Sequence, residues 1–516
     1  MKEASVLDYV KSKILFWRGE QIEIPTLEEI SADQQQSLLS DEHDELDPME
    51  EKAAQSDDVV LPEASSAAIE SETIIQTIFS TPAWSVFFVC APVGLALMAQ
   101  LALEPPHPGW RGGVFFYVWA AGVLVWAYLR KHWKLPALPQ SEPASDALAV
   151  RTLPLGVSIV SGLLAFFAFG GNLFTKTNLF LWTLSIGMYL VAFWEPSRAA
   201  YSWREMLRIA RDRIVGFSER GIRFSAWTLL VLAVFTLAAF FRFYRLGQVP
   251  PEMFSDHAEK LFDVADVLNG KTSIFFPRNT GREAFQMYLT AAAAKLFGTG
   301  LSFLSLKLGT ALCGLFTLPF IYLLGKEMAN RRVGLWAMAF AGIAYWPNVI
   351  SRVALRFTLY PFFAAPTLFF LVRGLRRRKR NDILMAGLFL GLGLHGYSPF
   401  RFVPIVVLIL VGLYLLHRQA KSVRWQTFQE LILLAFMSLL VFSPLLRYAL
   451  ANMAAFNYRT MTRMTAMEVP LPGSAWQILF ENLWDALTMF FWNNGGIWVH
   501  SVVNRPALDV VSAALF

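Results

Sequence analysis

The segment SDHAEK at 255–260 brings four ionisable side chains together directly after an apolar stretch. Asp256 is the candidate general base, because a carboxylate beside a low-dielectric boundary can have a raised pKa that suits removal of a proton from a hydroxyl. A structural role also fits Asp256. The sequence FSDHAEKLFDVADVL predicts a helix that begins at Ser255 or Asp256, with an acid near its third position as in a capping box. One residue can fill both roles.

Two further side chains of this segment, His257 and Glu259, could take part in the same chemistry. His257 alone fits a structural role, as a hydrogen-bond partner, as well as it fits a metal ligand. Asp256, His257 and Glu259 could together hold a divalent metal, but three ligands within four residues of one helix do not all converge on one ion. The sequence therefore assigns no cofactor with certainty. A divalent metal held by His257 and Glu259 stays an open alternative.

Arginines recur in other segments that the topology below places on the same side as Asp256. Arg352 and Arg356 are four residues apart, so on a helix they would face one ligand together. Arg282 lies in NTGREAFQMY, and Tyr397 and Arg401 lie in LHGYSPFR. Guanidinium groups bind phosphate oxygens in a bidentate way, which makes a phosphate the natural ligand at a membrane interface. The alternative is that each arginine only reaches toward lipid headgroups.

The composition is that of a helical membrane protein. Of the 516 residues, 55% are hydrophobic and only 16% are charged, whereas soluble proteins have about 25% charged residues. Apolar runs of about 17–22 residues are long enough to cross a bilayer. The basic residues are scattered between these runs, which argues against nucleic acid as a partner. We expect an all-α polytopic protein with spans at 84–103, 113–129, 153–171, 178–194, 224–241, 301–324, 333–349, 357–373, 383–396, 402–416 and 427–445.

The orientation follows from short loops rich in Lys and Arg, which are expected in the cytoplasm. All of them fall on one side if the segment 283–297 does not cross, and its charged residues and short length favour an amphipathic helix at the interface. The N-terminus is then cytoplasmic, and the site residues are extracytoplasmic. The cytoplasmic loops are 130–134, 197–223, 325–332, 376–380 and 417–424. The outer segments are 242–300, 348–356, 397–401 and the chain after about 446.

The chain divides into four parts. Residues 1–80 form an acidic tail that we expect to be largely disordered and cytoplasmic, because about half of all acidic residues lie before residue 75. Four N-terminal spans occupy 81–196, and a basic cytoplasmic loop occupies 197–223. Residues 224–516 form the main transmembrane core. Since the sequence ends in ALDVVSAALF, where a new apolar run begins, we expect this core to be incomplete at its C-terminus.

This main core resembles a known superfamily. The acidic motif of the first outer loop, GRE, YLLGKEMANRRVGLWAMAFAGIAYWPNVISRVALR and AGLFLGLGLHGYSPFRFVP follow one another within 224–510. Their order resembles the GT-C membrane glycosyltransferases related to protein O-mannosyltransferases and to the aminoarabinose transferase of lipid A. The resemblance implies inverting transfer of a hexose or pentose from a polyprenyl-phosphate donor. The acceptor would be a glycan, lipid or protein at the outer face of the cell membrane.

The resemblance also implies roles for individual residues. Asp256 matches the Asp of an Asp-Glu pair and would deprotonate or orient the acceptor hydroxyl. His257 stands where the family has Glu, so Glu259 is a candidate to replace that second carboxylate. The residues expected at the donor phosphate are Arg282, Arg352, Arg356, Tyr397 and Arg401.

Two other functions stay open. A transporter or flippase for a lipid-linked sugar would need ionisable residues at mid-span, and the spans contain few, with Lys307 the nearest case. A relative that only binds lipid-linked sugars is also open, because His257 departs from the family pattern.

Overall fold

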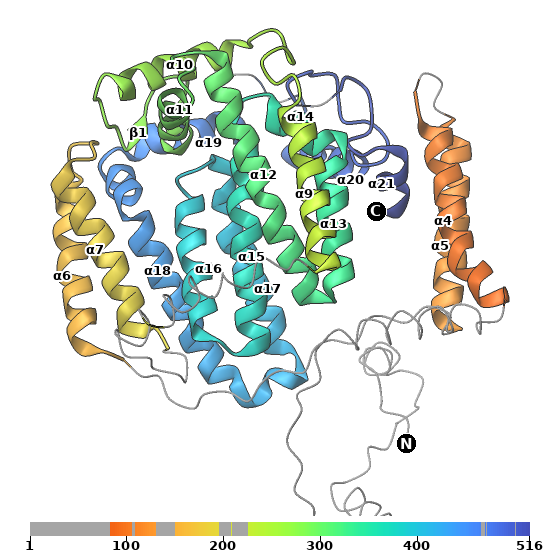
Figure 1. Ribbon diagram of the computed structural model, residues 1–516, viewed down its shortest axis with the longest axis horizontal. Coiled ribbons are helices and arrows are strands. Elements are labelled where there is room, and N and C mark those ends of the chain that lie inside the picture. Colours follow the sequence, from red (N-terminus) through yellow and green to blue (C-terminus); the bar gives the residue numbers. More distant parts are fainter. Residues whose placement is uncertain are drawn as a thin grey trace, which may run out of the picture. The chain divides into compact units, whose positions relative to one another are not determined.

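The computed structural model describes residues 83–105, 109–130, 150–195, 208, 225–465, 470, 472–500 and 502–516. The predicted acidic tail lies outside these residues, as do most of the two basic loops predicted at 130–134 and 197–223. Nearly all described elements are helices, as the all-α prediction requires (Figure 1). Within the described ranges the strands are two short ones, β1 (Phe275–Phe276) and β2 (Arg282–Glu283), which pair in antiparallel fashion.

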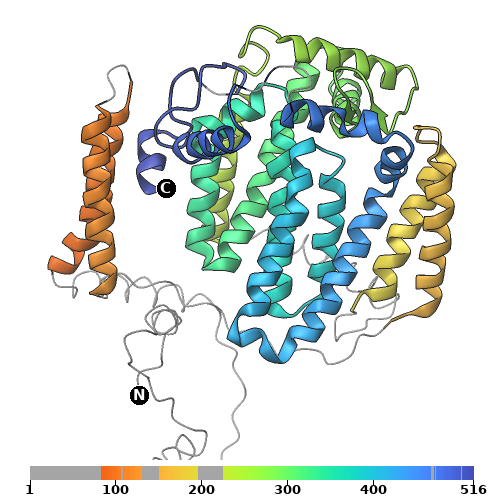
Figure 2. The ribbon, with the colours of Figure 1, turned by 180° about the vertical axis from the view of Figure 1, so that it is seen from behind.

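The four helices that precede the main core form two pairs. The first pair is α4 (Ala83–Leu103) with α5 (Trp110–Leu129), and the second is α6 (Thr152–Ala168) with α7 (Lys176–Phe193). The second pair packs against α18 (Arg424–Ala451), at the right-hand edge of the bundle in Figure 2. Trp182 Nε1 donates to Leu440 O at 3.0 Å across this contact, and Tyr189 Oη donates to Leu433 O at 3.2 Å.

The main core continues the predicted order of helices with bounds close to those expected. Its elements, besides α18, β1 and β2, are α9 (Ala226–Phe243), α10 (Ser255–Leu268), α11 (Phe285–Leu296), α12 (Phe303–Met328), α13 (Arg331–Ile343), α14 (Tyr345–Arg352), η2 (Arg356–Thr358), α15 (Leu359–Arg377), α16 (Arg380–Gly393), η3 (Ser398–Phe402), α17 (Val403–Leu416), η4 (Arg418–Val423), α19 (Met453–Met464), α20 (Ala475–Thr488) and α21 (Val510–Leu515).

Among the described residues, six helical segments are long and apolar enough to cross a membrane, and α13 with α14 would make a seventh. These two helices meet at a bend of 56°, so the segment predicted as a span at 333–349 is broken between Ile343 and Tyr345. The reason is Pro347. Its ring excludes a helical hydrogen bond and clashes with the preceding turn, and Ala344 is accordingly extended at φ −55° and ψ 137°. The carbonyls freed at the bend are bound by Arg242 and Asn348.

The loops gather at two ends of the bundle in the way the charge pattern predicts. At one end, the turn between α6 and α7 hydrogen-bonds to the segment before β1, with Phe174 N donating to Thr272 O at 2.7 Å. At the other end, Arg377 binds Glu327 at 2.7 Å and Arg380 binds Glu195 at 2.7 Å. The predicted cytoplasmic segments therefore meet one another, and so do the predicted outer ones.

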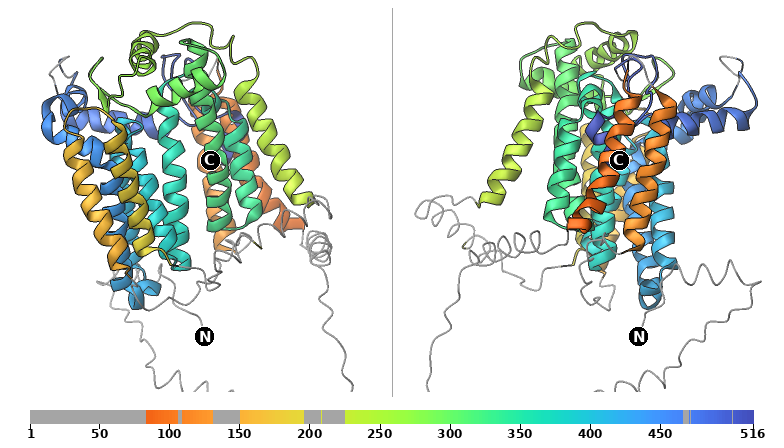
Figure 3. Two further views of the ribbon diagram at one scale, coloured as in Figure 1. Left: turned by 60° about the vertical axis from the view of Figure 1, so that its left-hand side comes forward. Right: turned by 90° about the vertical axis from the view of Figure 1, so that its right-hand side faces the viewer.

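Two helices of the first outer loop, α10 and α11, lie across the end of the bundle instead of along it (Figures 1 and 3). Helix α11 packs on α10 and α12 and does not cross, as predicted for 283–297. Gly281 makes the turn before β2 possible. Its φ is +91°, and a Cβ there would lie 2.5 Å from the ring of Phe275.

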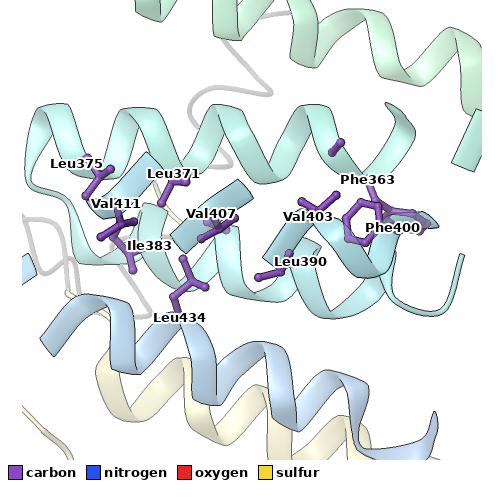
Figure 4. Packing of buried hydrophobic residues seen from close by; sticks show 12 residues of the cluster. Phe363, Leu371, Leu375, Ile383, Leu390, Phe400, Val403, Val407, Val411 and Leu434 are labelled. Atoms are coloured by element: carbon purple, nitrogen blue, oxygen red, sulfur yellow. The ribbon is translucent and has the colours of Figure 1, made fainter. Parts of the chain in front are cut away.

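A close-packed apolar core joins α15, α16, α17 and α18 and supports the loops above it. Figure 4 shows its side chains in a row between these helices. Phe363 and Phe400 close the row at the end nearest the outer loops, with ring centroids 6.3 Å apart. Burying Leu, Ile, Val and Phe side chains stabilises a protein by about 1.5–3 kcal/mol each in water; inside a bilayer, close packing replaces that driving force. The buried members of this core are Phe363, Ala364, Leu371, Leu375, Ile383, Ala386, Leu390, Phe400, Val403, Val407, Val411 and Leu434.

Candidate active site

The predicted helix in the SDHAEK segment exists as α10, and His257 has a structural part in it. Phe254 N donates to His257 Nδ1 at 2.8 Å, and His257 N donates to Phe254 O at 2.8 Å. His257 Nε2 donates to Val353 O at 2.6 Å. The reciprocal cap that was predicted with an acid is therefore made by His257. Burial lowers the pKa of His257 to about 4, so this imidazole is neutral at pH 7.

Because both ring nitrogens of His257 are engaged with the backbone, neither is free to bind a metal. Among the described residues, no group of three or more His, Cys, Asp and Glu side chains is arranged to hold an ion. Glu259, the other metal candidate, is half-buried on α10, and its negative charge raises the pKa of Arg282. We therefore derive no step through a metal.

Asp256 stands at the start of α10 with its carboxylate partly exposed. Asn279 Nδ2 donates to Asp256 Oδ1 at 2.7 Å, and Lys260 Nζ lies 4.0 Å from Asp256 Oδ2. Burial raises the pKa of Asp256, but Lys260, the Asn279 hydrogen bond, Arg282 and Arg459 together hold it below its usual value. The raised pKa expected from the sequence is wrong, because neighbouring cations outweigh the low-dielectric boundary.

Strand β2 places Arg282 and Glu283 in different surroundings, because successive side chains of a strand point to opposite faces. Arg282 Nη1 donates to Asp263 Oδ2 at 3.2 Å, and both side chains are buried. Arg278 binds the other oxygen of Asp263 at 2.8 Å. Arg282 thus belongs to an ion-pair group with α10, while its Nη2 is buried without a hydrogen-bond partner.

Glu283 is the centre of the second ion-pair group, and its side chain is fully buried. Arg356 Nη1 donates to Glu283 Oε2 at 2.7 Å, and Arg401 Nη2 donates to Oε1 at 3.0 Å. Ser398 Oγ donates to the same carboxylate at 2.8 Å. These partners come from η2 and η3, far apart in sequence, so Glu283 holds two candidate phosphate-binding arginines next to each other.

Arg352 and Arg356 do not act as one helical pair, which corrects the expectation from their spacing. Helix α14 ends at Arg352, and Ala354 has φ +64°, a left-handed conformation that turns the chain. Gln286 Nε2 holds this turn by donating to Ala354 O at 2.9 Å. Arg352 instead donates to Phe241 O at 2.8 Å, to Arg242 O at 3.3 Å and to Val249 O at 3.3 Å, so it binds the C-terminal end of α9.

Tyr397 lies beside Arg356, whose guanidinium carbon is 5.4 Å from the centre of the Tyr397 ring. Burial raises the pKa of this tyrosine, and opposing charges of Arg356 and Arg459 lower it. The negative charges of Glu283 and Asp256 raise the pKa of the same hydroxyl. The charges of the candidate base and of the arginine group therefore both reach Tyr397.

Helix α19 adds residues that sequence reasoning did not include in the site. Arg459 Nη1 donates to Thr280 Oγ1 at 3.2 Å. The positive charge of Arg459 lowers the pKa values of Asp256, Lys260 and Tyr397. Arg401 lies 3.9 Å from the ring centre of Phe456 on the same helix. Lys260, Ser398 and Asn279 were also missed. Lys260 had one available signal, its i,i+4 spacing from Asp256, which places both on one helix face.

An apolar cavity of about 510 Å³ opens beside these charged groups. Its walls come from α9, α12, α13, α14, α15 and the loop after α20. Phe357 lines the cavity and follows Arg356 directly, and its ring also lies 5.8 Å from that of Tyr397. The cavity and the charged cluster therefore share a wall. Such a pairing suits a ligand with an apolar tail and an anionic head.

Comparison with known proteins matches part of this chain to one family. Residues 285–448 match the family described as dolichyl-phosphate-mannose-protein mannosyltransferase. The matched region contains Arg352, Arg356, Tyr397 and Arg401, whereas Asp256 and Glu283 precede it. No curated protein matches the chain. Residues 285–448 carry a domain of the dolichyl-phosphate-mannose-protein mannosyltransferase family, and this family implies a membrane glycosyltransferase of the GT-C type.

Proposed function

We propose that this glycosyltransferase moves a sugar from a polyprenyl-phosphate donor to an acceptor hydroxyl at the extracytoplasmic face, with inversion. The observation that carries the proposal is the shared wall between the arginine group and the apolar cavity, at Arg356 and Phe357. A cavity lined by Leu318, Ile321, Ile350 and Pro361 suits part of an isoprenoid tail. The phosphate would then lie at Arg356 and Arg401.

The roles of the residues follow from where charge develops during transfer. Asp256 takes the proton from the acceptor hydroxyl as its oxygen attacks the anomeric carbon. The bond from that carbon to the phosphate oxygen breaks, and negative charge grows on the leaving phosphate. Arg356 and Arg401 are held in place by Glu283 beforehand, so their remaining N–H groups stabilise this charge without rearranging. The free Nη2 of Arg282 is a third candidate donor.

The outer location rests on the positive-inside pattern together with the two groups of loops described above. Two buried basic residues of the described spans, Lys307 and Arg242, give no support to a transport pathway. Lys307 is buried and donates to Leu246 O at 3.0 Å and to Pro250 O at 2.6 Å. Arg242 binds the carbonyls at the bend between α13 and α14. Both side chains therefore satisfy backbone groups of the fold.

Asp256→Asn tests this function directly. The full chain is reconstituted into lipid vesicles with radiolabelled polyprenyl-phosphate hexoses and pentoses, and transfer to membrane or peptide acceptors is measured. Removing a general base lowers the rate by about 10²–10⁴-fold. The matched control is Asp266→Asn, an acid of the same helix that binds Arg278 and Lys271. If Asp256→Asn transfers sugar at the parental rate, Asp256 is not the base. If the parent only moves the donor across the vesicle membrane, the protein is a flippase.

A further inference from the structure

Lys260 is a buried charged residue to which the mechanism above gives no role. Its side chain is 3% exposed, and Nζ donates to the backbone oxygen of Asp256 at 3.0 Å. The nearest carboxylate oxygen, Asp256 Oδ2, is 4.0 Å away and belongs to a partly exposed side chain. Four charged side chains from different elements influence the pKa of Lys260. They are Asp256 on α10, Arg282 on β2, Arg356 on η2 and Arg459 on α19.

This arrangement disfavours a permanent ammonium ion. Three of these four charges are positive, and the carboxylate of Asp256 lies 4.0 Å away, beyond hydrogen-bond distance. Burial is the main cause that lowers the pKa of Lys260 to about 7, and the charge of Arg356 follows. At neutral pH the amine and the ammonium ion are therefore both populated. Adding one negative charge nearby would favour the ammonium form.

We propose that Lys260 receives the proton that Asp256 takes from the acceptor, and so balances the charge that forms on the leaving phosphate. The proposal rests on the function proposed above. Lys260 lies one helical turn after the candidate base, with Nζ 4.0 Å from its carboxylate, and the charge of Arg356, the arginine proposed to bind the phosphate, acts on Lys260. A modest movement of its end brings Nζ from 4.0 Å to hydrogen-bond distance of the Asp256 carboxylate.

The atoms and charges of this step balance. The acceptor oxygen forms a bond to the anomeric carbon, and its proton goes to the carboxylate of Asp256. The bond between the anomeric carbon and the phosphate oxygen breaks, and the electron pair stays on that oxygen. The phosphodiester with one negative charge becomes a phosphate monoester with two. Asp256 then passes its proton to the neutral amine of Lys260. The new ammonium ion matches the new negative charge, and Lys260 returns its proton to water when the phosphate leaves.

Binding of the phosphate product should therefore draw a proton into the site. The probe is farnesyl phosphate, a polyprenyl phosphate that is a dianion at pH 8 because its second pKa is about 6. Calorimetric titration of the full chain in detergent, in buffers with different ionisation enthalpies, measures the proton uptake. We expect about 0.5 or more protons per bound farnesyl phosphate at pH 8.

Variants assign this uptake to Lys260. Lys260→Met has no amine to protonate, and Lys260→Arg is always charged, so both should lose the uptake. Lys271→Met is the matched control, because Lys271 is an exposed lysine of the same loop. The activity of the parent should also rise with pH through about 7, and that rise should be absent from Lys260→Arg.

The outcomes separate this inference from the proposed function. Binding of farnesyl phosphate by the parent chain without proton uptake overturns the role of Lys260 and leaves the donor site standing. An uptake that persists in both Lys260 variants has the same consequence. If farnesyl phosphate does not bind at all, the donor site itself is wrong, and the role of Lys260 falls with it. The measurement on the parent decides even if a variant fails to fold.

Discussion

Replacing Glu283 by Gln tests whether this carboxylate organises the arginines of the site. The change keeps the shape and an acceptor oxygen for Ser398 but removes the negative charge. Arg356, which is 4% exposed, and Arg401, which is 25% exposed, then lack their common partner. Two guanidinium ions next to each other without a counter-charge repel, and the more buried one cannot be solvated instead.

The magnitude follows from the burial of this pair. Removing one partner of a buried ion pair costs about 3–5 kcal/mol, and we expect the lower end because Gln still accepts a hydrogen bond. A loss of that size lowers the unfolding temperature by an amount on the order of 5 °C. Adding Arg356→Met to Glu283→Gln removes the uncompensated buried cation. The double variant should therefore be more stable than the sum of the two single losses predicts.

The assay is thermal unfolding of the full chain in one detergent, followed by tryptophan fluorescence. Glu252→Gln is the matched control, because Glu252 is an exposed acid of the same outer loop. Equal unfolding temperatures for Glu283→Gln and Glu252→Gln would refute the reasoning. If the stability losses of Glu283→Gln and Arg356→Met simply add in the double variant, the reasoning is also refuted, because two residues in direct contact should show a coupling energy.

Three further outcomes follow from single features of the structure. Burial lowers the folded pKa of His257 from 6.5 to about 4, so folding favours the neutral ring. The free energy of unfolding should therefore be highest above pH 6.5 and fall by about 3 kcal/mol as the pH drops toward 4. The fall should be smaller in His257→Asn, and unfolding measured at each pH tests this. Gly391→Ala places a Cβ 2.6 Å from Val441 and should lower the unfolding free energy by about 1–3 kcal/mol, whereas Gly412→Ala meets nothing within 4 Å and should be neutral or stabilising. Ile350→Trp fills part of the apolar cavity, so it should raise KM for a long-chain donor more than for a short-chain one; equal effects on both would show that the tail does not lie there.

Much of the architecture was predictable because a bilayer limits what a chain can do. Apolar runs of about 20 residues can only form helices there, since every backbone N–H and C=O must be bonded within the segment. The bounds of α12, α16 and α17 accordingly lie within a few residues of their predicted spans. The bend at Ala344 was the exception, although its signal, Pro347, stands in the sequence.

The contacts within the site were less predictable, because they depend on turns between elements. Arg352 and Arg356 are four residues apart, yet the left-handed turn at Ala354 sends them to different partners. The position of this turn depends on Gln286 and His257, which bind its carbonyls from other elements. No local pattern reports such long-range hydrogen bonds.

The sequence by itself determined that this chain is a helical membrane protein with acidic and basic groups gathered in segments between its spans. Hydrophobic length and loop charge are local properties of the sequence, and they decide directly which segments cross a bilayer and in which orientation. Only the tertiary structure decided which groups pair. It joins Glu283 to Arg356 and Arg401 across more than 70 residues of chain, and it surrounds Lys260 with cations. Burial and the charges of Lys260, Arg282 and Arg459 shift the pKa of Asp256, and burial with the charge of Arg356 lowers that of Lys260; both depend on distance in space.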